Sequence, residues 1–352
     1  MYKKIIRPIL FLLSPETIHR VTVLGLKILG RIPGGKALLR GACTVRHPSL
    51  EREVFGLKFP NPVGLAAGFD KNAEVYREIS CLGFGFVEIG TVTPLPQPGN
   101  PKPRLFRLVK DRAIVNRMGF NNNGVEETVK RLRNRDRRII IGGNLGKNTV
   151  TPNDTAPADY LRTFRRLYDH VDYFVINVSC PNVANLSELQ EEKSLKEILV
   201  PVLEFRRGQS QYRPILLKIS PDLTAGQIDN TIAVMKECKI DGIVATNTTV
   251  SRDGLKSERK TIRAIGRGGL SGAPLTERSI EMVRYIHEKT GGNFPIIGVG
   301  GIMSEEDAMA MLDAGACLIQ LYTGFIYEGP KFAKRICKKI RLESEIREAI
   351  RS

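Results

Sequence analysis

Residues 295–324 read PIIGVGGIMSEEDAMAMLDAGACLIQLYTG, and this stretch decides the fold class. It begins with a short apolar run, Pro295–Val299, continues with a helical pattern over Ser304–Ala314, and ends with a second apolar run, Cys317–Tyr322. Both runs are apolar at nearly every position, as in strands that are buried on both faces of a parallel sheet. The stretch therefore predicts a strand, a crossover helix and a second, parallel strand.

The same alternation extends back along the chain to about residue 53. Eight strands that alternate with helical patterns over about 260 residues predict a (β/α)₈ TIM barrel. The alternative is an open doubly wound sheet, but no strand precedes a Gly-x-Gly-x-x-Gly helix start with an acidic residue about 20 positions later. The other predicted elements are a hairpin over Glu53–Phe59, strands at Val63–Ala67, Phe86–Val92, Ile139–Gly143, Tyr173–Val178, Ile215–Ile219 and Gly242–Thr246, and helices at Asn72–Leu82, Asp159–His170, Ala225–Cys238 and Thr276–Glu288.

The composition is that of an ordinary globular protein, with 42% hydrophobic and 26% charged residues. Lys and Arg number 54 against 37 Asp and Glu, and the net charge of +17 favours anionic partners such as nucleic acid, acidic lipid, a phosphorylated cofactor or an anionic substrate. The densest basic run, Lys130–Arg138, is better explained as a solvated helix face than as a nucleic-acid footprint. The six cysteines lie far apart without a Cys-x-x-Cys motif, which argues against structural zinc, an iron–sulfur cluster and a disulfide framework.

The first 31 residues mix apolar and basic side chains. They contain neither a signal-peptide cleavage pattern nor an apolar run long enough to span a membrane. Ser14 is a good helix N-cap with Pro15 at the first helical position, so we expect two short helices. A helical hairpin on an anionic membrane surface and a helix pair packed on the body of the protein fit this pattern equally well. We expect a helical segment at residues 1–45 and a catalytic barrel at residues 46–352.

Gly, Asn, Thr and Lys residues gather at the carboxyl ends of nearly all the predicted strands, where barrel enzymes have their sites. Such a site is rich in amides and poor in carboxylates, which suits a planar heterocycle and a phosphate and does not suit a hydrolase or a divalent metal ion. Gly300–Gly301 and Thr323–Gly324 follow the last two strands, where barrels commonly bind phosphate. We expect no metal site.

Nine motifs at these strand ends and their loops are specific in combination. They are GLAAGFDKN (Gly64–Asn72), EIGTVTP (Glu88–Pro94), PQPGNPKPRLFRL (Pro96–Leu108), NRMGFNN (Asn116–Asn122), NLGKN (Asn144–Asn148), NVSCPN (Asn177–Asn182), ATNTT (Ala245–Thr249), GGLSG (Gly268–Gly272) and GVGGI (Gly298–Ile302). With these motifs the chain resembles the dihydroorotate dehydrogenases, FMN enzymes of pyrimidine synthesis, from His19 to about Tyr327. Its length and amino-terminal helices resemble the membrane-associated, quinone-using class.

The resemblance implies oxidation of dihydroorotate to orotate with FMN, electron transfer to a membrane quinone, and a peripheral location on an anionic membrane surface at the cytoplasmic face. The implied FMN contacts are Ala67, Gly68, Lys71, Thr91, Asn144, Asn177, Lys218, Thr246, Ser271, Gly272, Gly301, Tyr322 and Thr323. The implied orotate contacts are Lys71, Asn116, Arg117, Met118, Gly119, Phe120, Asn177, Asn182, Asn247 and Thr248, and the implied quinone contacts are His19, Arg107 and Tyr322.

The chemistry of these side chains suits the implied ligands. An Asn amide offers both a donor and an acceptor to the imide edge of a pyrimidine, and Lys71 is suited to pair with the substrate carboxylate. Lys218, beside the flavin, would stabilise the negative charge that hydride transfer adds to the ring.

Cys180 occupies the position of the catalytic base, which takes a proton from C5 of dihydroorotate while hydride leaves C6. The quinone-using class usually has Ser there and the soluble class Cys, and Val183 replaces a Thr that commonly relays the proton. Because a thiol with a pKa of about 8.5 ionises far more easily than a serine hydroxyl, we expect Cys180 to work as a thiolate with less dependence on a relay.

Three alternatives remain. The same flavin chemistry with a soluble acceptor such as fumarate is compatible with Cys180 and Val183, whereas NAD as acceptor would require an iron–sulfur partner to which nothing points. A flavin barrel that modifies tRNA uridines is compatible with the net charge, but we find no RNA-binding segment in the sequence and expect no nucleic-acid partner. A non-enzymatic basic protein of membrane surfaces is the third.

Overall fold

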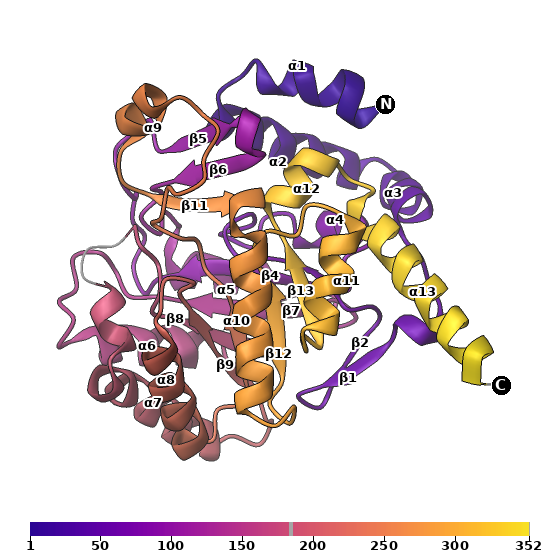
Figure 1. Cartoon of the computed structure of the whole chain (residues 1–352). Helices are drawn as coiled ribbons and strands as arrows, with labels where there is room; N and C mark the ends of the chain where they lie inside the picture. The colour runs from indigo at the N-terminus through magenta and orange to yellow at the C-terminus, as the bar shows by residue number, and fades with distance from the viewer. Residues whose placement is uncertain (183–185, 352) are drawn as a thin grey trace.

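The computed structural model describes residues 1–182 and 186–351, and its centre is a closed barrel of parallel strands surrounded by helices (Figure 1). Each barrel strand pairs with the next barrel strand along the chain, and the last pairs with the first. The predicted (β/α)₈ barrel is therefore confirmed, and the open sheet is wrong. The barrel strands are β3 (Val63–Leu65), β4 (Phe86–Val92), β7 (Ile140–Leu145), β8 (Tyr173–Asn177), β9 (Ile215–Ile219), β10 (Gly242–Ala245), β12 (Ile296–Val299) and β13 (Leu318–Leu321).

Two of the helices around the barrel begin at side-chain N-caps. Thr224 and Gln227 form a reciprocal capping box at the start of α8, whose bounds match the prediction, and the Ser304 side chain caps α11. The first helix after β3 is shorter than predicted, because the Asp70 carboxylate accepts the backbone N–H groups of Glu74 and Val75 and holds this stretch in a turn. The helices are α4 (Tyr76–Ser80), α5 (Gly124–Leu132), α6 (Ala156–Leu167), α7 (Glu192–Arg207), α8 (Ala225–Cys238), α10 (Thr276–Lys289), α11 (Glu305–Asp313), α12 (Thr323–Glu328) and α13 (Phe332–Arg351).

The predicted hairpin, β1 (Arg52–Val54) and β2 (Leu57–Phe59), lies at the amino-terminal end of the barrel. Phe55 and Gly56 at its tip both have positive φ, as a tight two-residue hairpin turn requires. Phe59 packs edge-on against Phe86 inside the barrel, with ring centroids 5.2 Å apart. The hairpin therefore closes this end, and the opposite end remains for a site.

A second sheet, which is not among the predicted elements, lies above the carboxyl end of the barrel (Figure 1). Its central strand β6 (Ala113–Asn116) pairs with β5 (Leu105–Leu108) and with β11 (Gly269–Gly272), all antiparallel. It therefore joins two connections that lie more than 150 residues apart in the chain. The remaining short elements are α9 (Arg259–Ile265), η2 (Pro48–Leu50), η3 (Val109–Asp111), η4 (Leu186–Gln190) and η5 (Ala273–Leu275).

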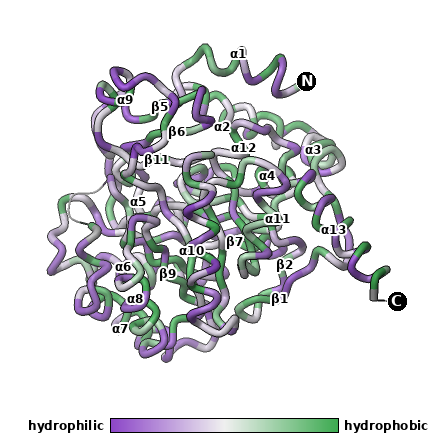
Figure 2. The backbone as a smooth tube through the Cα atoms, viewed as in Figure 1, coloured by the Kyte–Doolittle hydropathy of each residue, from purple (hydrophilic) through white to green (hydrophobic). Residues whose placement is uncertain are grey.

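The amino-terminal segment forms helices η1 (Tyr2–Ile6), α1 (Arg7–Phe11), α2 (Pro15–Arg31) and α3 (Gly35–Cys43). The Ser14 side chain caps α2 as predicted. The segment packs on the body of the protein, because α2 places one apolar face on the barrel core, and it exposes another apolar face to solvent. Its binding to a membrane surface stays a prediction. Figure 2 shows hydrophobic and hydrophilic stretches alternating along these helices. The division at residues 45 and 46 stays a prediction. The inward residues of α2 include Val23 and Leu26, and the exposed ones include Val21, Leu24 and Ile28.

Within the part of the chain that the structure describes, no helix taken singly is both long and apolar enough to cross a membrane. The pair Tyr2–Phe11 and Pro15–Arg31 reaches the required length and hydropathy only when taken together, across a bend of 118°.

Candidate active site

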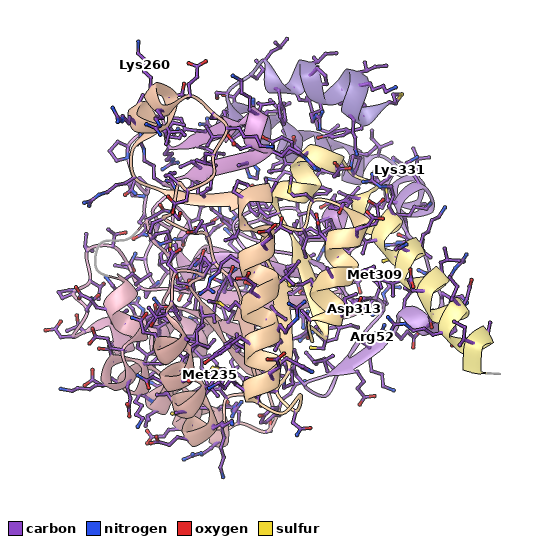
Figure 3. All side chains as sticks on the ribbon, in the orientation of Figure 1. Arg52, Met235, Lys260, Met309, Asp313 and Lys331 are labelled. Atoms are coloured by element: carbon purple, nitrogen blue, oxygen red, sulfur yellow. The ribbon has the colours of Figure 1, made fainter. Side chains whose placement is uncertain are left out.

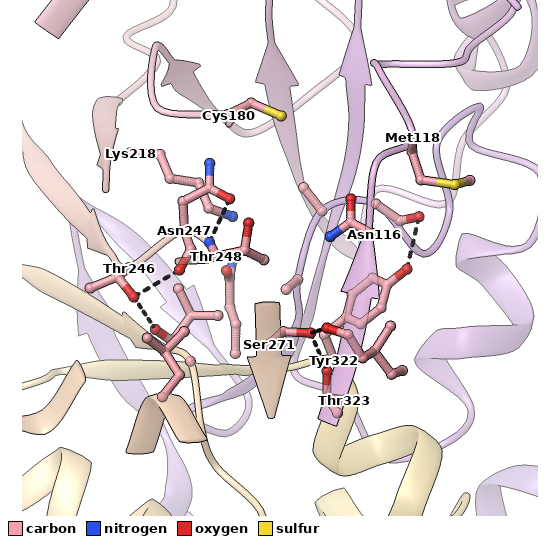
Figure 4. Close-up of a pocket in the computed structure, with 18 of the residues that line it drawn as sticks. Asn116, Met118, Cys180, Lys218, Thr246, Asn247, Thr248, Ser271, Tyr322 and Thr323 are labelled. Carbon is pink, nitrogen blue, oxygen red and sulfur yellow. Dashed lines mark hydrogen bonds between the residues drawn. The ribbon is translucent and has the colours of Figure 1, made fainter. Parts of the chain in front are cut away.

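A cavity opens at the carboxyl ends of the barrel strands and encloses about 1060 Å³ of space between atoms, its open mouth included (Figure 4). In Figure 4, Cys180 and Lys218 lie on one side of the view and Asn116 and Met118 on the other, with Ser271, Tyr322 and Thr323 below them. Both the barrel and the second sheet therefore contribute to one pocket.

Nearly all of the predicted FMN residues meet in this cavity. The exception is Asn144, which lies behind the wall and accepts hydrogen bonds from Thr91 Oγ1 at 2.6 Å and Asn177 Nδ2 at 3.2 Å. The lining residues of this set are Ala67, Gly68, Lys71, Thr91, Asn177, Lys218, Thr246, Ser271, Gly272, Gly301, Tyr322 and Thr323.

The predicted orotate residues also line the cavity, with one exception. The Arg117 guanidinium is directed away from it, donating to the carbonyl oxygens of Pro103 and Ile265, so this side chain holds loops together. The others are Lys71, Asn116, Met118, Gly119, Phe120, Asn177, Asn182, Asn247 and Thr248.

The amides in the cavity are oriented by one another. Asn182 donates from Nδ2 to Asn116 Oδ1 at 2.8 Å, and Asn247 donates to Asn177 Oδ1 at 3.3 Å. The buried Oδ1 atom of Asn182 has no hydrogen-bond partner within residues 1–182 and 186–351. A buried acceptor without a donor is costly, so this oxygen is suited to a ligand N–H.

Cys180 is half-buried in the cavity wall, and its protonation differs from the expected thiolate. Burial raises the pKa of the thiol to about 11, against the opposing effects of hydrogen bonds from Asn182 and the positive charges of Lys71 and Lys218. The resting side chain is therefore a neutral thiol at pH 7. Val183, the residue predicted to weaken the proton relay, lies outside the described residues.

Lys71 lies at the same cavity wall, and burial lowers its pKa to about 8, with a further contribution from the positive charge of Arg104. A lysine with this pKa is still mostly protonated at neutral pH. Its ammonium group is thus available to an anionic ligand.

Arg104 connects the amino-terminal helices to this side of the cavity. Its guanidinium binds both carboxylate oxygens of Glu16 on α2, at 2.9 and 3.3 Å, and donates to the carbonyl oxygens of Pro98 and Asn100. The Asn100 side chain in turn donates to the carbonyl oxygen of Asn182 at 3.1 Å. A continuous set of hydrogen bonds therefore runs from α2 to the cavity wall.

The predicted quinone residues lie between the cavity and the amino-terminal helices. Phe69 contacts His19 on one side, with ring centroids 4.9 Å apart, and Tyr322 on the other, at 6.2 Å. Burial lowers the pKa of His19 to about 4, so its imidazole is neutral at physiological pH. Arg107 does not line the cavity; its guanidinium stacks on Phe11 and donates to the carbonyl oxygens at the end of α1.

The lining fits a phosphorylated flavin. Among the described lining residues there are two lysines and no carboxylate, so the cavity favours an anion. Gly301 is buried with φ of +76°, and its N–H donates no hydrogen bond within the described part of the chain. A backbone N–H without a partner just after β12 is suited to donate a hydrogen bond to a phosphate oxygen.

Two residues of the site escaped sequence reasoning. Gln320 lines the cavity, and Glu88 lies fully buried behind it, accepting hydrogen bonds from Asn144 and Gln320. The signal for Glu88 was present, since a single carboxylate in the middle of an otherwise apolar strand requires a partner. Across residues 1–182 and 186–351, no cluster of His, Cys, Asp and Glu has the arrangement of a metal site.

Comparison with known proteins agrees with this geometry. The family model described as dihydroorotate dehydrogenase matches residues 49–343. The chain is 56% identical to the dihydroorotate dehydrogenase (quinone) of Christiangramia forsetii, covering 97% of this chain and 98% of that protein, and 48% identical to that of Thermobifida fusca, covering 96% and 90%. It superposes on the crystal structure of DHODH from Eimeria tenella in complex with ferulenol with a TM-score of 0.82 and 36% identity, covering 93% and 90% of the two chains.

The identity to these relatives extends over nearly the whole chain. The chain therefore belongs to the dihydroorotate dehydrogenase family and, within it, to the quinone-dependent class.

Proposed function

We propose that this enzyme oxidises dihydroorotate to orotate with FMN bound in the cavity at the end of the barrel and passes the electrons to a membrane quinone. The observation that carries the proposal is the lining, in which oriented amides, two lysines without a carboxylate, and Cys180 surround one pocket. Neither the fumarate alternative nor the tRNA alternative gains a specific observation.

Each group has a role in substrate binding. The ammonium group of Lys71 pairs with the substrate carboxylate, and the free Oδ1 atom of Asn182 accepts a ring N–H. Asn116 and Asn247 are held by other amides, so little side-chain freedom is lost when the pyrimidine binds.

Cys180 is the base. Its ionised sulfur accepts the proton from C5 of dihydroorotate, and the positive charges of Lys71 and Lys218 favour that ionised form. FMN held beside Lys218 and Gly301 would supply the two-electron acceptor for the hydride from C6 and the reductant for the quinone, which would take up two electrons and two protons to become a quinol.

The quinone approaches from the amino-terminal helices. His19, Phe69 and Tyr322 form a continuous aromatic surface from α2 to the cavity. A neutral His19 imidazole offers both a donor and an acceptor to a quinone carbonyl or quinol hydroxyl.

The visible spectrum of the purified protein tests the proposal. We expect a flavin absorbance band that bleaches when dihydroorotate is added without oxygen. A colourless protein, or a band that dihydroorotate does not bleach, would contradict it. Decylubiquinone should then restore the band within turnover time, whereas recovery only with fumarate would favour a soluble acceptor.

We further propose that α2 lies on the cytoplasmic face of the cell membrane. Val21, Leu24 and Ile28 are each half-exposed on one helix, with the basic residues Arg20 and Arg31 beside them. Apolar side chains flanked by positive charge are typical of helices that bind anionic lipid surfaces. Basic residues elsewhere, such as Lys260 and Lys331, also project from the surface (Figure 3).

Replacing Val21, Leu24 and Ile28 together by glutamine should lower binding to phosphatidylglycerol vesicles by at least about tenfold, because three apolar side chains would no longer leave water. Co-sedimentation with vesicles measures this. The control replaces three exposed valines outside the segment, Val150, Val200 and Val250, and should bind as the parent does. Equal losses in both triple variants would argue against a membrane role for α2.

A further inference from the structure

Glu88 in β4 is fully buried, and both of its carboxylate oxygens accept hydrogen bonds. Asn144 Nδ2 donates to Oε1 at 2.8 Å, and Gln320 Nε2 donates to Oε2 at 2.6 Å. Amide donors at both oxygens favour the negatively charged form of the group, because an ionised carboxylate only accepts hydrogen bonds. A negative charge therefore lies inside the barrel.

The counter-charge is Lys218. Its Nζ lies 3.8 Å from Glu88 Oε1, and both residues are buried, at 6% and 0% exposure. A buried ion pair is stable only if its remaining polar atoms are also hydrogen-bonded. For the carboxylate, the amides of Asn144 and Gln320 donate these hydrogen bonds. The four side chains come from β4, β7, β9 and β13 and meet inside the barrel.

The two charges differ in their access to the cavity. Lys218 and Gln320 line it, whereas Glu88 and Asn144 lie behind the lining. The Lys218 side chain therefore reaches the cavity and the carboxylate does not, and the negative charge of Glu88 weakens the positive potential that Lys218 produces in the cavity. At this depth such fields are weakly screened.

Glu88 also fixes the direction of an amide. Because Asn144 gives its N–H to Glu88, its Oδ1 must face Thr91 and Asn177, from which it accepts hydrogen bonds. The Asn177 amide is thereby oriented so that its own Oδ1 faces Asn247. A carboxylate behind the wall thus determines the donor and acceptor order of amides that line the cavity.

We propose that Glu88 is a positioning residue that holds Lys218 and Asn144 and, by opposing the charge of Lys218, lowers the reduction potential of the bound flavin. The inference rests on the proposed function, in which FMN lies beside Lys218. Reduction adds negative charge to the flavin ring, which Lys218 stabilises and Glu88 disfavours. Without Glu88 the flavin would be a stronger oxidant but would return its electrons to the quinone less favourably.

The test is the midpoint potential of FMN in the holoenzyme, measured by equilibrium titration against redox dyes. Glu88→Gln should shift the flavin equilibrium toward the reduced form by at least about tenfold, which is about 30 mV for a two-electron couple. Glu88→Asp, which retains the charge, should stay nearer to the parent than Glu88→Gln. Asp172→Asn is the matched control, since Asp172 pairs with Arg135 and Arg213 before β8, at the opposite end of the barrel, and it should cause no shift.

Glu88→Gln leaves Lys218 buried without its partner, which can prevent folding. A second comparison therefore uses Lys218→Met and the double variant Lys218→Met/Glu88→Gln, in which no buried charge of the pair remains. We expect Lys218→Met to lower the potential and the double variant to have a higher potential than Lys218→Met alone. Equal potentials in these two, or a Glu88→Gln enzyme with the parental potential, would overturn the role of Glu88.

These outcomes are distinct from a failure of the proposed function. A parent protein without flavin absorbance would remove the proposed function itself. If the parent binds FMN and is bleached by dihydroorotate, but the FMN midpoint potential is the same in the Glu88 variants, only the inference about Glu88 is wrong.

Discussion

Replacing Cys180 with alanine is expected to slow the reduction of bound FMN by dihydroorotate by about a hundredfold to ten-thousandfold, the usual contribution of a general base. The sulfur lines the cavity beside Asn182, and the hydrogen bonds around it come from residues that also face the substrate. Anaerobic stopped-flow measurement of flavin bleaching isolates this half-reaction from the quinone step. Cys238→Ala, which changes a thiol at the end of α8, is the control and should react as the parent does.

The pH dependence of the same rate tests the ionisation of Cys180. Burial raises the pKa of the thiol to about 11, so the ionised form is scarce at neutral pH and increases about tenfold for each pH unit toward that value. The limiting rate of flavin reduction should therefore rise with pH from about 6 to 9. A flat profile in the parent, or a Cys180→Ser enzyme with full turnover at neutral pH, would exclude the sulfur as the base.

Replacing Lys71 with methionine is expected to weaken orotate binding by at least about a hundredfold, because the ligand carboxylate would be buried without its counter-charge. Titration of the flavin spectrum with orotate measures the dissociation constant directly. Lys147→Met provides a matched control: Lys147 is also buried, but it lies outside the cavity and donates to the carbonyl oxygen of Thr151. Flavin content must be retained in both variants for the comparison.

The affinity for orotate should also depend on pH through Lys71. Its pKa is lowered to about 8, so the ammonium form is complete below that pH and is lost above it. Orotate binding in the parent should therefore weaken as the pH rises beyond about 8, and this dependence should be absent in Lys71→Met. The same pH dependence in both proteins would assign it to another group.

The barrel could be predicted because each of its strands is a short apolar run. Such runs are typical of strands in a parallel sheet that is covered on both faces. The second sheet could not, since β5, β6 and β11 have only four residues each and β6 pairs across more than 150 positions. Local sequence carries no signal for that pairing. The late start of α4, at Tyr76 and not at the predicted Asn72, likewise depends on Asp70, which accepts hydrogen bonds from the backbone N–H groups of Glu74 and Val75.

The position of the site could be predicted from the residues at the ends of the strands, but the directions of its side chains could not be predicted from the sequence. Arg117 belongs to a motif whose neighbours line the cavity, yet its guanidinium binds loop carbonyls instead. The protonation of Cys180 was also beyond the sequence, because the pKa of a thiol depends on how much water surrounds it. Glu88 could have been found from its place in an apolar strand, whereas its partner Lys218 is 130 residues away.

The hydrogen bonds of Arg104 connect the amino-terminal helices to the wall of the cavity. Because Glu16 holds Arg104, and the loop that Arg104 braces holds Asn182, the first helices support the cavity wall that we propose binds the pyrimidine. Deleting them to obtain a shorter, more tractable enzyme would leave a cationic guanidinium without its carboxylate partner and loosen the far side of the pocket. The amino-terminal helices and the cavity wall are therefore joined through hydrogen bonds, and a change in one is expected to alter the other.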